Sequence, residues 1–238
     1  MKRNRTGFEL AATDLVGYLN CRHLTDLERA VAECSLPRPK SWKPLLEVLR
    51  ERGALHEKAF VDHLKAGGLD VVHIDGAEIS TRAVAQTLDA LRRGVSVIVQ
   101  GALSNGSWGG RTDVLRRVET PSRLGTWSYE VIDTKLARET KAGSVLQLCV
   151  YSDLLRHAQG LSPEYMHIVA PWTSFVPQPY RFADYAAYFP PRAEGAHRRA
   201  LHRSLNGQLS RSKGALRRLP LYRTELKVEI SQRTSLPP

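Results

Sequence analysis

The sequence lacks the features of a membrane protein or a disulfide-bonded secreted protein. No uninterrupted apolar run reaches the roughly 18 residues typical of a membrane-spanning helix, and the basic start MKRNRTGFEL is not followed by an apolar signal segment. The three cysteines, Cys21, Cys34 and Cys149, are far apart, which excludes a disulfide framework and a zinc-finger spacing. We therefore expect a soluble, cytoplasmic protein with reduced cysteines and no membrane contact.

Acidic residues are also scarce relative to basic ones. The chain has 24 Asp and Glu against 35 Lys and Arg, a net charge of +11, and such a surface attracts phosphate backbones. Residues 190–238 contain eleven Lys or Arg and three Asp or Glu, a net of +8, which leaves only +3 for residues 1–189. This basic segment is compatible with a solvated or disordered tail and equally with a polyanion-binding arm.

The length and composition allow one large domain, or one domain with an appendage. At 238 residues with 42% hydrophobic residues, the chain can bury a substantial core. We expect the domain to span residues 1–189 and the atypical basic tail to span residues 190–238, where only TELKVEI has the pattern of a short strand.

The spacing of apolar residues, together with the glycine and proline positions, predicts alternating helices and strands. The predicted helices cover residues 14–33, 45–64, 81–93 and 142–158, and the predicted strands cover residues 69–74, 95–103, 111–118, 126–137 and 164–171. Three of these strands follow one another without an intervening helix. The order predicts an α/β core with a mixed central sheet flanked by helices.

The stretch SYEVIDTKLARET combines a strand pattern with two charged residues near its end. Successive side chains of a strand point to opposite faces, so Asp133 and Lys135 share one face. Taken alone, the two residues are also compatible with a weak surface ion pair.

A third charged residue, Asp113, lies in the preceding strand, within WGGRTDVL. If the two strands pair as an antiparallel hairpin, Asp113 and Asp133 converge at one end of the sheet. Carboxylates that close repel each other unless a cation lies between them, and Mg²⁺ prefers such oxygen ligands and retains waters that can attack phosphate. Lys135 would then stabilise negative charge that develops in the transition state.

Two predicted helices contribute further candidates. His56 and Glu57 lie within RGALHEKAF, and Gln147 and Tyr151 are four residues apart on one helix face. A lone helical histidine is also compatible with a surface or core-edge position, and the second pair with ordinary helix packing.

Taken in order, these residues resemble the RecB-type nucleases of the PD-(D/E)xK superfamily. The resemblance covers about residues 10–175 and consists of GALHE for the histidine motif, GGRTDVL for the first acid, VIDTK for the acid and lysine, and QLCVY for the Gln-x-x-x-Tyr motif. It implies a restriction-endonuclease-like core and metal-dependent, exonuclease-like hydrolysis of DNA phosphodiester bonds on single-stranded ends.

The resemblance also implies a role for each matched residue. It gives four ligands for Mg²⁺ or Mn²⁺: the side chains of His56, Asp113 and Asp133 and the backbone carbonyl of Thr134.

The remaining matched residues would serve the chemistry or the substrate. Lys135 would be the catalytic lysine, and Gln147 and Tyr151 would support the site and contact DNA. Glu57 is a weaker candidate with no matched role.

The cysteines depart from one branch of this family. The segment YLNCRHLTDLERA resembles the N-terminal segment of the iron–sulfur members, which include the CRISPR-associated adaptation nucleases, and Cys21 matches their first cluster ligand. Those relatives have three more cysteines near the C-terminus, but no cysteine follows Cys149 here, so we expect no iron–sulfur cluster. We expect Cys34 and Cys149 to be buried apolar residues.

This departure coincides with the atypical tail and predicts a family member whose C-terminus is replaced or truncated. Two alternatives to an active DNase therefore stay open. The first is a DNA-binding module with weak or no catalysis. The second is a nuclease subunit that works only with a helicase, DNA-repair or CRISPR adaptation partner. The sequence leaves the oligomeric state and the strand preference open.

Overall fold

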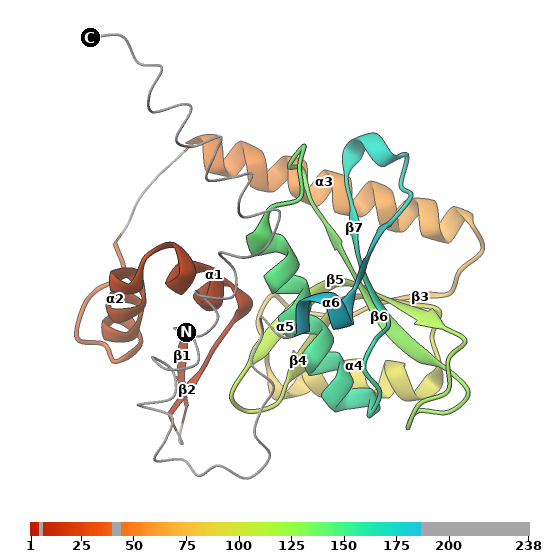
Figure 1. Cartoon of the computed structure of the whole chain (residues 1–238), viewed down its shortest axis with the longest axis horizontal. Helices are drawn as coiled ribbons and strands as arrows, with labels where there is room; N and C mark the ends of the chain where they lie inside the picture. The colour runs from red at the N-terminus through yellow and green to blue at the C-terminus, as the bar shows by residue number, and fades with distance from the viewer. Residues whose placement is uncertain (5–6, 40–43, 187–238) are drawn as a thin grey trace, which may run out of the picture.

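A six-stranded mixed sheet, flanked by helices, forms the centre of the protein (Figure 1). The computed structural model describes residues 1–4, 7–39 and 44–186, and the basic segment 190–238, including TELKVEI, lies outside the described residues. The strand order is β3-β4-β5-β6-β7-β8. The strands are β3 (Val71–His73), β4 (Val97–Ser104), β5 (Gly109–Val118), β6 (Ser128–Thr134), β7 (Tyr165–Val169) and β8 (Gln178–Arg181).

The strands pair in both directions, as the mixed sheet requires. β4 pairs antiparallel with β5, and β5 pairs antiparallel with β6, in a continuous meander, which confirms the predicted run of three strands. β3 pairs parallel with β4, and β6 pairs parallel with β7. Each of these parallel pairs is joined through a helix because a tight turn cannot connect parallel strands.

Helices cover both faces of the sheet (Figure 1). On one face Phe60, Val61 and Leu64 of α3 (Pro44–Ala66) pack against valine and isoleucine side chains of the central strands. On the other face α1 (Ala12–Asn20), α4 (Thr81–Arg93) and α5 (Ala142–Gln159) form the larger core. The central strands are therefore buried on both faces, as the apolar run VSVIVQGAL predicts.

Local capping signals determine the bounds of α4. Ala83 N donates a 3.1 Å hydrogen bond to Oγ of Ser80 at the start of the helix, and Gly94 ends it with a left-handed φ of 70°. The predicted helix over residues 81–93 is confirmed.

The single helix predicted over residues 14–33 is wrong, because the chain breaks at Cys21 into α1 and α2 (Arg22–Ala32). Cys21 has extended backbone angles of φ −155° and ψ 114°. Leu15 and Tyr18 of α1 are buried in the core, whereas no described side chain of α2 is buried. The sequence around Cys21 does not signal this change of direction, because neither glycine nor proline stands at the break.

The cysteine expectation is half confirmed. Cys149 is buried in α5, but Cys34 is exposed after α2, with a left-handed φ of 60°. Among the described residues, five elements were not predicted: the hairpin of β1 (Lys2–Asn4) and β2 (Gly7–Glu9), the 3-10 helix Pro171–Thr173, the edge strand β8, and the short helix α6 (Phe182–Ala186).

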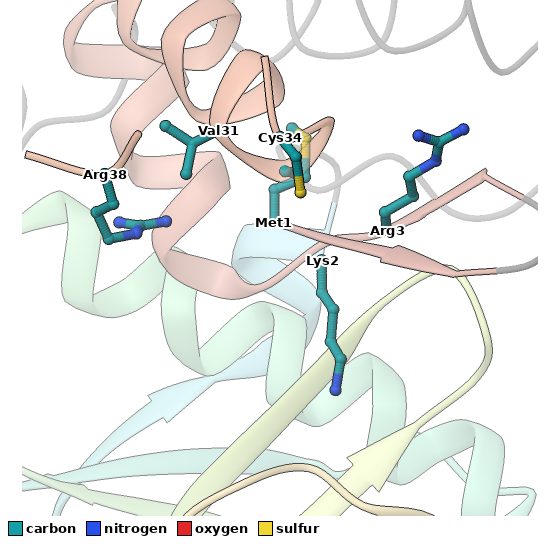
Figure 2. Close-up of a pocket in the computed structure, with 7 residues that line it drawn as sticks. Met1, Lys2, Arg3, Val31, Cys34 and Arg38 are labelled. Atoms are coloured by element: carbon teal, nitrogen blue, oxygen red, sulfur yellow. The ribbon is translucent and has the colours of Figure 1, made fainter. Parts of the chain in front are cut away.

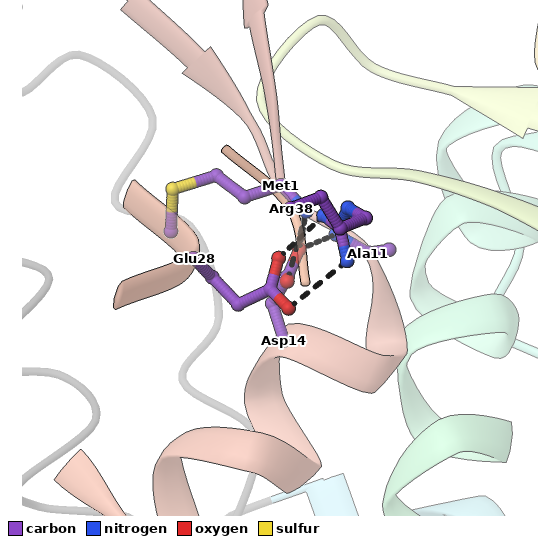
Figure 3. A network of polar contacts seen from close by, with 5 residues as sticks. All are labelled: Met1, Ala11, Asp14, Glu28 and Arg38. Atoms are coloured by element: carbon purple, nitrogen blue, oxygen red, sulfur yellow. Dashed lines mark hydrogen bonds and ion pairs between the residues drawn. The ribbon is translucent and has the colours of Figure 1, made fainter. Parts of the chain in front are cut away.

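Ion pairs tie together the N-terminal region (Figure 3). The amino group of Met1 lies 2.7 Å from Oδ2 of Asp14, which also accepts a 2.8 Å hydrogen bond from Ala11 N. Arg38 Nη2 lies 2.8 Å from Oε2 of Glu28. These contacts join the N-terminal hairpin to α1 and the segment after α2 to α2.

The same region has a wide, open depression (Figure 2). Its lining includes the basic side chains of Lys2, Arg3 and Arg38 together with Val31 and Cys34. Its lining comes entirely from residues 1–38, so it is separate from the acidic residues of the central sheet. Among the described residues, no helix is long and apolar enough to span a bilayer.

Candidate functional site

The register of the central strands brings the two predicted acids together. Val114 pairs with Ile132 at the end of the β5–β6 ladder, so the next position in this register places Asp113 opposite Asp133. This confirms the expectation that the antiparallel hairpin makes the acids converge. On the other side of β5, Gln100 of β4 occupies the position opposite Asp113.

Asp133 is the most deeply buried charged residue of this group, with 1% of its surface exposed. Within the described residues neither of its carboxylate oxygens has a hydrogen bond of standard geometry, although Oδ2 forms a 2.6 Å ion pair with Lys135 Nζ. Burial and the charge of Asp113 raise the pKa of Asp133 from 3.8 to about 7, and Lys135 lowers it only in part. Lys135 therefore offsets only part of the cost of burying this carboxylate beside a second acid, and a cation at this position would offset more of it.

Asp113 is better satisfied than Asp133. Its Oδ2 accepts hydrogen bonds from the backbone N and the Oγ1 of Thr134, both at 2.8 Å. The amide and hydroxyl of Thr134 thus hold Asp113 in place, and the predicted ligand role of its backbone carbonyl stays a prediction.

The helix α3 presents Glu57 to the same region. Gln100 Nε2 donates a 2.5 Å hydrogen bond to Glu57 Oε1, and Arg111 Nε donates a 3.2 Å bond to the amide oxygen of Gln100. Burial raises the pKa of Glu57, and the charge of Asp113 raises it further. Glu57 therefore adds a third carboxylate near Asp113, although the matched motifs gave it no role.

Sequence reasoning missed Gln100 and Arg111. Gln100 has a left-handed backbone with φ of 56°, which is uncommon for a residue other than glycine and more so inside a strand. Its side chain reaches Glu57, which belongs to α3. A Cβ on the next residue, Gly101, would instead meet Leu115, which belongs to the larger core on the opposite face of the sheet. The only sequence signal for this network is a polar residue within the apolar run VSVIVQGAL.

The side chain of His56, a residue of α3, lies beside the end of β7. Its Nε2 is 3.1 Å from the carbonyl oxygen of Val169, which also accepts a 3.0 Å hydrogen bond from Lys135 N. Its ring stacks on Phe175, with 6.1 Å between the ring centroids. In the described part of the chain, no three His, Cys, Asp or Glu side chains are grouped closely enough to hold a metal ion, so the ligand role of His56 stays a prediction.

Gln147 and Tyr151 approach the acids from α5. Gln147 Nε2 donates a 2.9 Å hydrogen bond to the Tyr151 hydroxyl. Burial raises the pKa of Tyr151 to about 12, the bond from Gln147 opposes this, and the charges of Asp133 and Asp113 add to it.

Gly110 makes room for this tyrosine. A Cβ at Gly110 would overlap the Tyr151 ring, so only glycine allows the ring to lie against β5 at this point. Close packing against Tyr151 therefore explains why the second residue of the motif GGRTDVL is glycine.

The predicted residues occupy one end of the sheet, between α3 and α5. The structure joins them as three contacting pairs, Asp113 with Thr134, Asp133 with Lys135, and Gln147 with Tyr151, and it places His56 at the adjoining end of β7. Comparison of the sequence with protein-family models and with curated proteins found no match. The resemblance to RecB-type nucleases therefore rests on the motifs and the geometry of this chain alone.

Proposed function

We propose that the protein is a divalent-metal-dependent nuclease that hydrolyses DNA phosphodiester bonds. The observation that carries this proposal is Asp133, a buried carboxylate that lies opposite Asp113 and whose ion-pair partner among residues 1–4, 7–39 and 44–186 is Lys135. Two neighbouring acids in this environment repel each other, and a cation between them offsets both the repulsion and the desolvation.

The donor set suits a hard cation. Asp113 and Asp133 would hold Mg²⁺ or Mn²⁺ through their oxygens, and the family resemblance adds His56 and the carbonyl of Thr134. When bound, the metal supplies an activated water and neutralises charge on the phosphate.

The remaining residues have roles that follow from their contacts. Lys135 Nζ lies 2.6 Å from Asp133 Oδ2 and is partly exposed, and in this proposal it would donate a hydrogen bond to the attacking water or to a phosphate oxygen. This positive charge would stabilise the negative charge that grows on the phosphate. The Gln147–Tyr151 pair would keep the α5 side of the site in place and contact DNA.

The proposal includes a restriction-endonuclease-like core. It is supported by the antiparallel meander β4–β5–β6 and by the crossover through α5 to the parallel strand β7. It is also supported by the location of both acids at the point where the β5–β6 ladder ends.

Cleavage of 5′-labelled single- and double-stranded DNA with Mg²⁺, Mn²⁺ or EDTA tests the function. We expect metal-dependent cleavage that Asp133→Asn and Lys135→Ala each abolish while the circular dichroism spectrum stays unchanged. Lys58→Ala, which removes an exposed lysine from α3, is the matched control and should cleave normally. Cleavage that persists in both site variants contradicts the proposal.

A DNA-binding module without hydrolysis is the second candidate, and the net charge of +8 in residues 190–238 favours it. It predicts salt-sensitive DNA binding without cleavage, and weaker binding when these residues are removed. A nuclease subunit dependent on a helicase or adaptation partner would instead cleave only when that partner is added.

A further inference from the structure

The loop between β7 and β8 presents a large aromatic side chain beside Lys135. Trp172 lies in a short 3-10 helix, Pro171–Thr173, and is 50% exposed. It lines a cavity of about 50 Å³ that is also lined by Lys135, Arg138, Thr140, Ser144 and Gln178. Because Lys135 pairs with Asp133, this cavity adjoins the candidate catalytic acids.

The loop is held in one conformation by its own backbone hydrogen bonds. Thr173 donates two bonds to the carbonyl of Ala170, from N at 3.1 Å and from Oγ1 at 2.8 Å. Val176 N donates a 2.9 Å bond to the carbonyl of Thr173. Trp172 therefore projects from a fixed turn.

The turn contains two consecutive residues in an unfavourable backbone conformation. Ser174 and Phe175 have left-handed φ values of 49° and 62°, although neither is glycine. Such strain persists only where the surrounding structure compensates for it, and it concentrates at functional sites.

Packing of the Phe175 side chain against α3 provides this compensation. The Phe175 ring lies among His56, Phe60 and His63, with centroid distances of 6.1, 6.2 and 5.2 Å. The anchored Phe175 fixes the loop on α3, and Trp172 remains on the outside with half of its surface exposed to water.

The charges around Trp172 favour an anionic ligand with aromatic rings. Lys135, which is 27% exposed, and the exposed Arg138 line the cavity together with Trp172, and the exposed Glu139 is the one acid in its lining. Basic side chains beside an exposed aromatic face are typical of single-stranded nucleic-acid sites, where phosphates pair with the charges and bases stack on the ring.

We propose that Trp172 is a stacking platform for a nucleobase of single-stranded DNA, with Arg138 contacting the neighbouring phosphate. The cavity has room for a few water molecules but not for a base, so the base lies on the exposed face of the indole. This inference rests on the proposed function for the chemistry at Lys135, but the stacking itself requires no hydrolysis. Bases inside a duplex do not expose their faces, so the platform selects unpaired strands.

The test measures binding by the full-length protein in EDTA, where no cleavage interferes. The probes are a fluorescent oligothymidylate and an abasic oligonucleotide of the same length, followed by fluorescence anisotropy. We expect Trp172→Ala to weaken oligothymidylate binding by roughly 5- to 100-fold, the range for one lost base stack. Trp172→Phe should retain most of the affinity because its ring can still stack.

Two controls separate stacking from a general loss of structure or charge. Tyr165→Ala removes another exposed aromatic residue, at the opposite end of β7, and should leave oligothymidylate binding unchanged. The abasic oligonucleotide should bind the wild type and Trp172→Ala equally. An equal loss for both probes, or no loss in Trp172→Ala, overturns the platform.

The same samples distinguish this inference from the proposed function. Wild-type protein that binds through Trp172 but never cleaves with Mg²⁺ or Mn²⁺ contradicts only the nuclease and supports the platform. Protein that cleaves normally and binds equally well without Trp172 contradicts only the platform. Absence of oligothymidylate binding by the wild type also overturns it.

Discussion

The strand β6 contains two buried carboxylates in opposite situations. Glu130 is 8% exposed, and both of its oxygens have partners: Tyr165 N at 2.9 Å and His167 Nε2 at 2.8 Å. Asp133 is 1% exposed, and within the described part of the chain its partners are Lys135, through an ion pair, and the second acid, Asp113, opposite it. A buried acid with both oxygens satisfied has a structural role, whereas a buried acid left unsatisfied beside a second acid indicates a place for a ligand.

The largest expected difference between the two acids is in activity. Asp133→Asn should lower metal-dependent DNA cleavage by at least about 10²-fold, because it removes charge needed at the site. Glu130→Gln should leave the cleavage rate within a few-fold of the wild type once the protein is folded. Initial rates on one labelled oligonucleotide measure both, and similar losses in the two variants would remove the distinction.

The stabilities should differ in the reverse sense. In Glu130→Gln, an amide group replaces the carboxylate whose two oxygens contact Tyr165 N and His167 Nε2, so one of these contacts is lost. We therefore expect this substitution to lower the free energy of unfolding by about 1–3 kcal/mol. Asp133→Asn should raise the free energy of unfolding at pH 8, because it removes an unfavourable buried charge. Urea denaturation at pH 8 measures both changes, and destabilisation by Asp133→Asn would contradict our account of this residue.

The pH dependence sharpens the same comparison. The pKa of Asp133 is raised by burial from 3.8 to about 7, so the folded state binds this proton more tightly than the unfolded state does. Its contribution to stability is therefore full below pH 3.8 and is lost as pH rises to about 7.

The measurement is the free energy of unfolding of the wild type and Asp133→Asn across this range, without metal. The difference between them should grow in favour of the variant up to about pH 7 and then stay constant. Mn²⁺ at pH 8 should raise the melting temperature of the wild type and have little effect on Asp133→Asn.

The smallest expected effect concerns the strained turn near the Asp133 end of the sheet. Ser174 is exposed and has a left-handed φ of 49°, so Ser174→Gly should relieve strain. We expect an increase of roughly 0.5 kcal/mol in the free energy of unfolding, since the lower steric cost is partly offset by the flexibility of glycine in the unfolded chain. Thermal denaturation checks the sign, and a clear loss of stability would show that the serine has a role beyond its backbone.

The sequence by itself determined the elements whose signals are local. The cap at Ser80 and the stop at Gly94 define α4, and the apolar runs define the meander β4–β5–β6. Strand alternation places Asp133 and Lys135 on one face, and helical spacing places Gln147 near Tyr151. These predictions succeeded because each depends on residues a few positions apart.

Only the tertiary structure decided which of these residues meet. The left-handed backbone of Gln100, the approach of Glu57 to Asp113 and the anchoring of Phe175 on α3 depend on segments far apart in the chain. The break at Cys21 likewise follows from the packing of α1 and has no local marker. Propensity and periodicity act over a few residues, whereas burial, strain and the repulsion between the two acids arise only when the strands and helices pack together.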